Sequence, residues 1–238
     1  MKKSLLFVLG VLLTAPALAE NTAVVPAPRL TKTNWVSRHE AFLAEAKQGP
    51  CDLVFLGDSI TDWWRTRGLE VWNKFYAPRH ALNLGIGGDR TQYVLWRIEH
   101  GELDQVNPKV VVLMIGTNNL GKEKDGSPRN SIPEVIEGVT AIVKEIRARL
   151  PESKLLLLGI FPRGTADSPY RLQIKEINQA IAKLDDGKMI KYLDIGKVFL
   201  EEDGSIPKTI MPDRVHPSAE GYQRWAEAME PTLAALMK

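Results

Sequence analysis

The sequence predicts an α/β fold, a three-layer α/β/α sandwich built on a five-stranded parallel sheet. Short apolar runs alternate along the chain with longer segments whose apolar residues recur at helical spacing. Two of the runs, at 109–115 and 154–160, are apolar without alternation, which indicates strands covered on both faces. Strands that alternate with helices form parallel sheets with helices packed on either side.

Five strands and five helices account for most of the chain after residue 33. Strands are expected at 52–56, 80–84, 109–115, 154–160 and 189–195, and helices at 34–48, 91–101, 132–150, 169–185 and 217–236. Pro133 and Pro217 stand where the third and fifth helices are expected to begin, as is common in first helical turns. Without an internal repeat or a low-complexity block, residues 34–238 are expected to form one domain.

Residues 1–19 have the pattern of a secretory signal peptide. Two lysines precede an apolar run that is too short to span a bilayer, and Ala17-Leu18-Ala19 forms an A-x-A cleavage site. Residues 20–33 contain prolines and no periodicity, and they are expected to form an N-terminal tether. The mature protein is therefore expected to begin at Glu20 and to be exported, either periplasmic or secreted.

The charge balance does not favour nucleic acid or membrane partners. The chain has 31 Lys and Arg against 29 Asp and Glu, and without Lys2 and Lys3 the balance is neutral. Such a balance gives no electrostatic footprint for nucleic acid or for an anionic membrane. No apolar run after residue 20 approaches the roughly 20 residues that a membrane helix needs. Cys51 is the single cysteine, so an intrachain disulfide is impossible and an inert buried thiol is expected.

Four polar segments follow the predicted strands. "GDSI" follows the first strand, "GIGGDR" the second and "GTNN" the third, and "MPDRVHP" lies between the fifth strand and the last helix. In open parallel sheets, ligands bind beyond the carboxyl ends of the strands. These four segments are therefore expected to converge on one edge and to form the functional site.

Ser59 and His216 are the candidate nucleophile and base. Gly57 lets the chain turn, and Ser59 then opens a short helix whose free amides favour negative charge. Asp213 stands three residues before His216, so its carboxylate can accept the Nδ1–H and leave Nε2 to take the serine proton. Each feature alone is also typical of a helix cap or a turn, and no G-x-S-x-G elbow is present.

Two further segments can stabilise a developing negative charge. The glycines of "GIGGDR" let a backbone N–H approach a reacting atom, although the pattern matches no phosphate-binding loop. Asn118 in "GTNN" can donate its side-chain N–H to an oxyanion, or it can simply form an Asx-turn. A metal site is the alternative, because Asp58, Asp89, Asp213 and His216 could be drawn together. With one loop histidine this donor set is thin, and no metal or cofactor is expected.

The order of these segments resembles the SGNH/GDSL hydrolase family. Ser in "GDSI", Gly in "GIGGDR", Asn in "GTNN" and His in "DRVH" occur in the order of the family's four blocks. The stretch from "GDSITDWW" to "GTNN" is especially similar to the catalytic subunits of platelet-activating-factor acetylhydrolase and their bacterial relatives. The resemblance implies a flavodoxin-like SGNH-hydrolase fold over residues 34–238 and a serine esterase without a cofactor.

The resemblance also implies the role of each site residue. Ser59 is the nucleophile, His216 the base and Asp213 its orienter. The N–H groups of Ser59 and Gly88 and the side chain of Asn118 form the oxyanion hole. Two departures stand out: Ile60 replaces the leucine of the family name, and the cytosolic animal enzymes lack a signal peptide. Their lipid substrate is therefore not carried over.

The expected activity is hydrolysis of short-chain esters, above all acetyl esters, of a small molecule or of an O-acetylated carbohydrate. Residues expected to contact substrate flank the catalytic pair, namely Asp58, Ile60, Trp63, Trp64, Thr117 and Val215. Ile60 and Val215 are expected to close the acyl pocket, and the two tryptophans either bind a sugar ring or pack in the core. A lipase or lysophospholipase and a non-catalytic carbohydrate-binding module remain alternatives. The oligomeric state is open, although the resembling animal enzymes form dimers.

Overall fold

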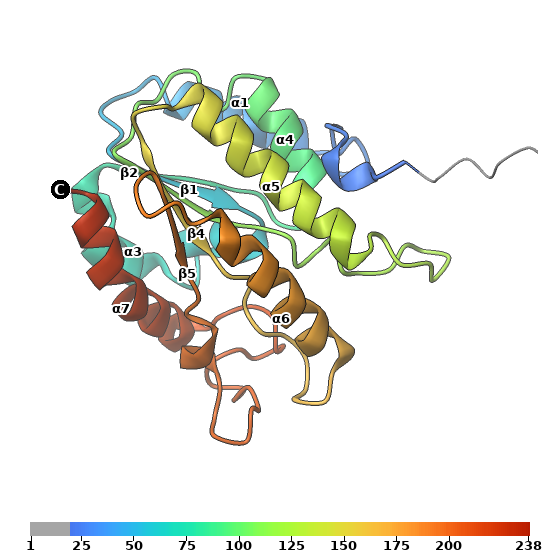
Figure 1. The fold of residues 1–238 in the computed structure, drawn as a ribbon. Helices are drawn as coiled ribbons and strands as arrows, with labels where there is room; N and C mark the ends of the chain where they lie inside the picture. Colours follow the sequence, from blue (N-terminus) through green and yellow to red (C-terminus); the bar gives the residue numbers. More distant parts are fainter. Residues whose placement is uncertain (1–19) are drawn as a thin grey trace, which may run out of the picture.

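One parallel sheet runs through the part of the chain that the structure describes, residues 20–238 of a computed structural model (Figure 1). The predicted signal peptide, residues 1–19, lies outside the described residues. The strands of the sheet are β1 (Leu53–Gly57), β2 (Ala81–Gly85), β3 (Val110–Met114), β4 (Lys154–Leu158) and β5 (Ile190–Leu193). Their order is β2-β1-β3-β4-β5, so the winding reverses between β1 and β3, where doubly wound folds bind ligands.

Helices cover both faces of this sheet, which confirms the predicted three-layer α/β/α fold. One face packs against α1 (Trp35–Glu45), α4 (Thr91–Glu99), α5 (Ile132–Arg149) and α6 (Pro169–Ile181). The other face packs against α3 (Leu69–Phe75) and α7 (Ala219–Leu236), as the two sides of the sheet in Figure 1 show. Val54 and Leu56 of β1 belong to the first core, and Leu53 and Phe55 to the second. Both faces of the strand are therefore apolar, as its continuous hydrophobicity predicts.

Local signals explain where the long helices begin. The Ser131 side chain accepts the Glu134 N–H, and the Glu134 carboxylate accepts the Ser131 N–H, which is a complete capping box at the start of α5. Ser218 caps α7 by accepting the Gly221 N–H at 3.2 Å. Between β1 and β2 the sequence predicts only a short helix at Ser59, but α2 (Ser59–Asp62) is followed by α3. Seven residues give too few turns for a clear periodic signal.

Residues 20–33 differ from the predicted tether, because they pack against the domain. A short 3₁₀ helix, η1 (Thr22–Val24), contacts α4 and α5, and Ala23 is fully buried. Thr91 Oγ1 donates to the Ala23 carbonyl at 2.8 Å, which fixes the segment in place. The segment, here called the arm, follows an irregular path over other elements, so its sequence needs no periodicity of its own.

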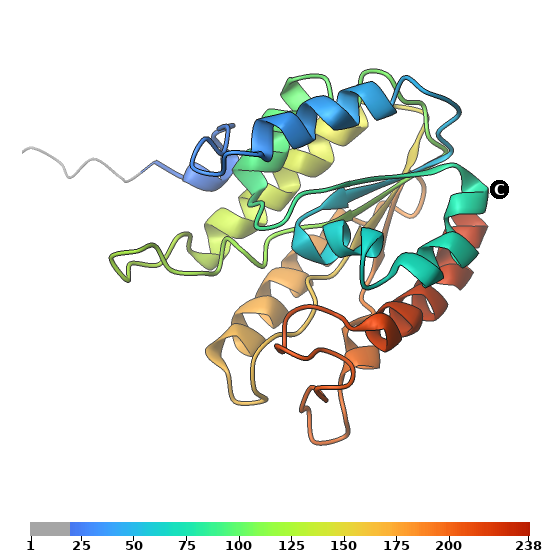
Figure 2. The same cartoon turned by 180° about the vertical axis from the view of Figure 1, so that it is seen from behind.

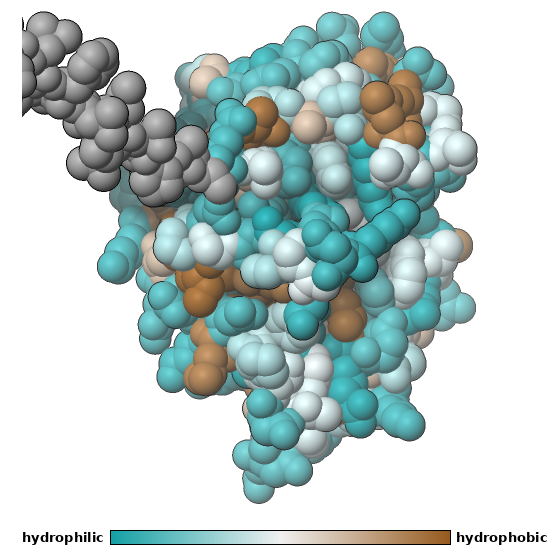
Figure 3. Space-filling view, turned by 90° about the vertical axis from the view of Figure 1, so that its right-hand side faces the viewer, coloured by the Kyte–Doolittle hydropathy of each residue, from teal (hydrophilic) through white to brown (hydrophobic). Residues whose placement is uncertain are grey.

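The end of the molecule at which the β3–α5 loop projects is largely polar. This loop, residues 118–131, extends away from the body in the view from behind (Figure 2). The space-filling view of that side shows a mostly hydrophilic surface with hydrophobic residues in separate patches (Figure 3). Among residues 20–238, no helix is both long and apolar enough to cross a membrane.

Candidate active site

Ser59 is the first residue of α2, and only Asp58 separates it from the end of β1. Gly57 makes the turn possible, since a Cβ there would stand 2.5 Å from the Met114 carbonyl oxygen of β3. The Asp58 carboxylate caps the short helix by accepting the Ile60 N–H at 2.9 Å. Because Asp58 performs the capping, the Ser59 hydroxyl is free for another partner.

That partner is His216, which comes from the loop before α7. Ser59 Oγ and His216 Nε2 are 2.9 Å apart, and His216 Nδ1 lies 2.7 Å from Asp213 Oδ2. Asp213 Oδ1 also accepts the backbone N–H groups of Val215 and His216, so the turn itself places the carboxylate under the ring. With Nδ1–H donated to Asp213, the neutral ring presents Nε2 as an acceptor for the serine proton.

The carboxylate of Asp213 is held in its charged form. Partial burial pushes its pKa up, but hydrogen bonds from the backbone and ring of His216 outweigh this effect and leave the pKa below its ordinary value. The three residues can therefore move a proton from Ser59 to His216 and stabilise the resulting charge.

Gly88 and Asn118 belong to the segments that follow β2 and β3, and the first of these segments lies beside Ser59, because Ser59 Cβ is 3.8 Å from the point where a Cβ of Gly87 would stand. Gly88 has a φ of +83°, in the left-handed region that favours glycine. Asn118 Nδ2 donates to the Asp89 carbonyl oxygen at 2.9 Å and, over a longer 3.3 Å, to Asp58 Oδ2. Burial raises the pKa of that Asp58 carboxyl to about 7. The Asn118 side chain thus contacts the residue before Ser59, and the glycine segment lies next to Ser59.

Four residues that are expected to contact substrate are buried in this structure. Asp58 caps α2, and the Ile60 side chain lies in the second core. Trp64 is 0% exposed, with its ring centroid 4.4 Å from that of Tyr222 and 4.8 Å from that of Trp225. Thr117 is 3% exposed and accepts hydrogen bonds from Arg163. Contact of these four residues with substrate stays a prediction.

Trp63 and Val215 remain at the site. The Trp63 ring stacks on the His216 ring with centroids 4.0 Å apart, and the Arg67 guanidinium lies over Trp63 at 4.2 Å. Val215 is half-buried beside His216. Adjacent tryptophans thus have separate environments, one beside the base and one in the core. Contact of Trp63 and Val215 with substrate stays a prediction.

A buried ion-pair network beneath the glycine segment could not be predicted from the sequence. Asp89 Oδ2 pairs with Arg97 Nε at 3.0 Å, and Asp89 Oδ1 accepts the Trp35 indole N–H at 2.7 Å. Arg97 also pairs with Glu102, and all three charged side chains are buried. The network anchors the segment that carries Gly88. The residues of this network come from separate segments of the chain, so no local sequence motif predicts the network.

The same network bears on the alternative of a metal site. Asp89 is committed to Arg97 and Trp35, and Asp58 to the helix that it caps. Within the described part of the chain, no three His, Cys, Asp or Glu side chains are grouped so that they could hold a metal ion. A cavity of about 500 Å³ exists between α6 and β5, and neither Ser59 nor His216 lines it.

Known proteins resemble this chain in sequence and in structure. Residues 55–224 match the GDSL-like Lipase/Acylhydrolase family. The human platelet-activating factor acetylhydrolase IB subunit alpha1 is 36% identical over 204 residues, which cover 85% of this chain and 84% of that protein. A GDSL-like lipase from Bacteroides thetaiotaomicron has a similar structure, with a TM-score of 0.65 at 19% identity over 83% of this chain and 97% of the other. An acetylxylan esterase from Geobacillus stearothermophilus gives a TM-score of 0.60 at 21% identity over 78% and 95%.

The fold and the Ser59–His216 contact define a serine hydrolase on an α/β/α sandwich. The family match covers most of the chain, and the chain belongs to the GDSL-like lipase/acylhydrolase family, also called SGNH hydrolases. It is a carboxylic ester hydrolase of that family.

Proposed function

We propose that this enzyme hydrolyses short-chain carboxylic esters, above all acetyl esters, through an acyl-enzyme on Ser59. The observation that carries the proposal is the hydrogen-bonded series from Ser59 Oγ to His216 at 2.9 Å and from His216 to Asp213 at 2.7 Å. Nucleophile, base and orienting carboxylate stand in the order that covalent ester hydrolysis needs.

In the first half of the reaction, Ser59 Oγ attacks the ester carbonyl carbon while His216 Nε2 takes the hydroxyl proton. The carbonyl oxygen becomes an oxyanion, and the N–H groups of Ser59 and Gly88 and Asn118 Nδ2 stabilise it. The protonated His216 then gives its proton to the leaving alcohol as the C–O bond breaks. Asp213 stabilises the imidazolium throughout.

In the second half, water repeats the attack on the acyl-enzyme. His216 takes a proton from the water, the oxyanion forms again in the same place, and Ser59 leaves as its hydroxyl with the proton returned by His216. The products are the carboxylic acid and the free enzyme. To join the oxyanion hole, the Asn118 side chain turns one N–H away from Asp58 Oδ2. The hydrogen bond that breaks is long, at 3.3 Å, and therefore weak.

The acetyl preference is supported by the names of the relatives, since the proteins about 36% identical to this chain are acetylhydrolases. It is tested by kcat/KM on p-nitrophenyl acetate, butyrate, octanoate and palmitate. A restrictive acyl site gives a steady decline with chain length, whereas an open groove gains about 0.8 kcal/mol for each buried methylene. A maximum at octanoate or beyond would contradict the proposal and favour a lipase or lysophospholipase.

The alcohol half of the ester is tested with the same protein. Acetylated glycans are included beside small acetyl esters, because the half-buried Trp63 next to His216 offers its second face to a sugar ring once the Arg67 guanidinium, which lies 4.2 Å from the ring centroid, moves aside. Trp63→Phe keeps an aromatic ring and Trp63→Leu does not. If carbohydrate esters are the substrate, Trp63→Leu loses activity on them much more than on p-nitrophenyl acetate.

Export is part of the proposal and rests on the pattern of residues 1–19. Expression of the whole chain in a Gram-negative host, followed by fractionation and N-terminal sequencing, tests it. Mature protein outside the cytoplasm that begins at Glu20 is expected. Retention in the cytoplasm with an intact N-terminus would refute export and leave the esterase activity untouched.

A further inference from the structure

The turn that carries Gly88 can adopt two forms. Asp89 N–H donates to the Ile86 carbonyl at 3.1 Å, and Gly88 has a φ of +83°, which together indicate a type II turn. Type I and type II turns differ in the orientation of their central peptide, here Gly87–Gly88. Glycine at both central positions makes both orientations accessible. The turn alone therefore does not decide which way the Gly88 N–H points.

Two cations of the arm hold the carbonyl of this peptide. Arg29 Nη1 donates to the Gly87 oxygen at 2.8 Å, and Lys32 Nζ donates to the same oxygen at 3.2 Å. Neither cation pairs with a carboxylate among residues 20–238. On the other side, Gly87 N–H donates to Asp62 Oδ2 at 3.1 Å, and Arg38 holds Asp62 at 2.6 Å.

The two hydrogen bonds to the Gly87 carbonyl oxygen also fix the orientation of the Gly88 N–H. A trans peptide is planar, and its C=O and N–H point in opposite directions, so the Gly87 oxygen and the Gly88 N–H turn together. Rotation to the type I form would break both charge-assisted hydrogen bonds. Donors on a carbonyl also polarise the peptide and strengthen its N–H as a donor.

We propose that Arg29 and Lys32 are positioning residues that keep the Gly88 N–H in the orientation needed for an oxyanion hole. The inference rests on the proposed function, in which that N–H stabilises the oxyanion. Arg29 also lies against Gly88 itself, since a Cβ at Gly88 would stand 2.6 Å from Arg29 Nη1. The arm, although remote from Ser59 in sequence, is thus a part of the active site.

A different role for the same cations makes a different kinetic prediction. Lys32 Nζ and Ser59 Cβ each lie 3.8 Å from the point where a Cβ of Gly87 would stand, so Lys32 is also near the reacting ester. A cation that binds an anionic substrate acts mainly on KM for that substrate. A cation that orients an oxyanion donor acts on kcat for a neutral acetate, because the oxyanion exists only in the transition state.

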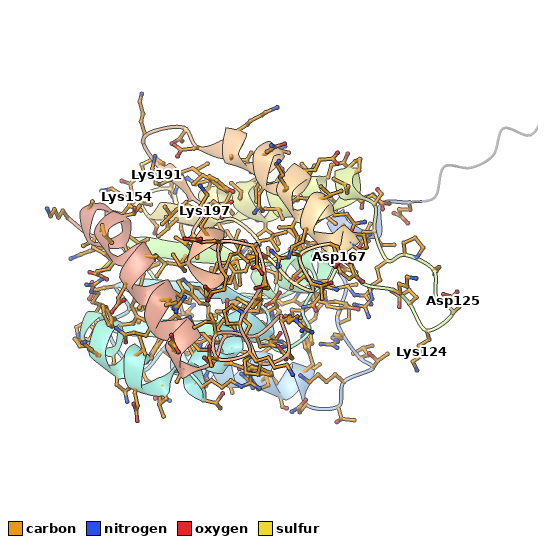
Figure 4. All side chains as sticks on the ribbon, turned by 90° about the horizontal axis from the view of Figure 1, so that it is seen from below. Lys124, Asp125, Lys154, Asp167, Lys191 and Lys197 are labelled. Atoms are coloured by element: carbon orange, nitrogen blue, oxygen red, sulfur yellow. The ribbon has the colours of Figure 1, made fainter. Side chains whose placement is uncertain are left out.

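The test is steady-state kinetics on p-nitrophenyl acetate with Arg29→Gln, Lys32→Met and the double variant. We expect kcat to fall about 3- to 10-fold in each single variant and about 100-fold in the double variant, near the loss of one oxyanion donor, with KM changed less than about twofold. Lys32→Arg keeps two or more donors and should retain most of kcat. Lys154→Met is the matched control, because Lys154 is the first residue of β4 and so lies at the edge of the parallel sheet opposite the strand ends that precede Ser59 and Gly88. Figure 4 shows Lys154 on the opposite side of the molecule from Lys124 and Asp125 of the β3–α5 loop.

A second readout is independent of turnover. A trifluoromethyl ketone forms a tetrahedral adduct with serine, so its affinity should fall in the double variant in parallel with kcat/KM. A double variant that keeps kcat and inhibitor affinity, or that raises KM alone, overturns the inference. If the double variant is unfolded by circular dichroism, the single variants decide, and an unchanged kcat in both overturns it. A wild type that hydrolyses no acetyl ester would instead refute the proposed function.

Discussion

The side chains of Asp58 and Ser59 have different roles: Asp58 caps the helix and Ser59 contacts His216. A serine that opens a helix commonly caps it, which would occupy its hydroxyl. Here the Asp58 carboxylate accepts the Ile60 N–H, and the Ser59 hydroxyl faces His216. The Asp-Ser pair in "GDSI" thus provides a capped helix and a free nucleophile at one strand end.

Asn118 provides a test at the scale of a single donor. Asn118→Ala should lower kcat by about 10²–10³, or ~2.7–4 kcal/mol, because one oxyanion donor is lost, while KM changes little. Steady-state kinetics on p-nitrophenyl acetate measure both constants. Asn107→Ala, an exposed asparagine before β3, is the control and should match the wild type. An unchanged kcat in Asn118→Ala would reduce Asn118 to a turn residue.

The contact of His216 with Ser59 could be anticipated from sequence, but the burial of their neighbours could not. The D-x-x-H spacing and the order of the four segments depend on local turns and on strand ends. By contrast, Trp64 and Ile60 are buried because α7 brings Tyr222 and Trp225 over them from more than 150 residues away. Packing between residues so far apart in the chain cannot be predicted from a short sequence motif.

At the scale of elements, the adjacent tryptophans should respond differently to truncation. Trp64→Ala should cost about 3–5 kcal/mol of unfolding free energy, since it empties a core between α3 and α7. Trp63→Ala should cost much less stability but lower kcat, because the ring that stacks on His216 is lost. Urea unfolding and kinetics on both variants measure the contrast. Equal stability losses would contradict it.

His39 on α1 should make stability depend on pH. It is 3% exposed, and its ring lies parallel to that of Trp35 and edge-on to that of Trp96. Burial lowers its pKa from 6.5 to about 4, with a further contribution from Arg97. Between these values the unfolded chain binds a proton that the folded chain does not. The unfolding free energy is therefore full above pH 6.5 and falls towards pH 4, by up to about 3 kcal/mol from this group.

Replacement of His39 should reduce the fall in unfolding free energy between pH 6.5 and pH 4. Urea unfolding at pH 7.5 and pH 4.5 compares the wild type with His39→Phe, in which the loss of stability on acidification should be smaller. His80→Gln, at a half-exposed histidine, is the control and should keep the wild-type slope. Equal slopes in the wild type and His39→Phe would show that His39 is not the group that couples stability to pH.

The elements themselves were predictable where their signals were long. All five strands and the five longer helices lie where apolar runs and helical periodicity place them. The arm was missed because residues 20–33 are ordered by contacts with α4 and α5 rather than by any pattern of their own. For the same reason nothing in the sequence pointed to Arg29 or Lys32.

At the scale of the whole molecule, the site is assembled from distant segments by the sheet. Ser59, Gly88 and Asn118 follow β1, β2 and β3, which are neighbours in the sheet, and His216 reaches Ser59 from the loop before α7. The parallel arrangement puts all three strand ends at one edge. The four-segment order in the sequence is therefore a consequence of the fold, and it predicts the site better than any one segment does.

The most direct test of the acyl-enzyme is to count the reactive serines of the whole protein. A fluorophosphonate reacts with an activated serine, and intact-mass spectrometry gives the number of adducts per chain. The account predicts one adduct on the wild type, mapped to Ser59 by peptide analysis, none on Ser59→Ala, and much slower labelling of His216→Ala. Labelling at another serine, or full esterase activity in a folded Ser59→Ala variant, would contradict it.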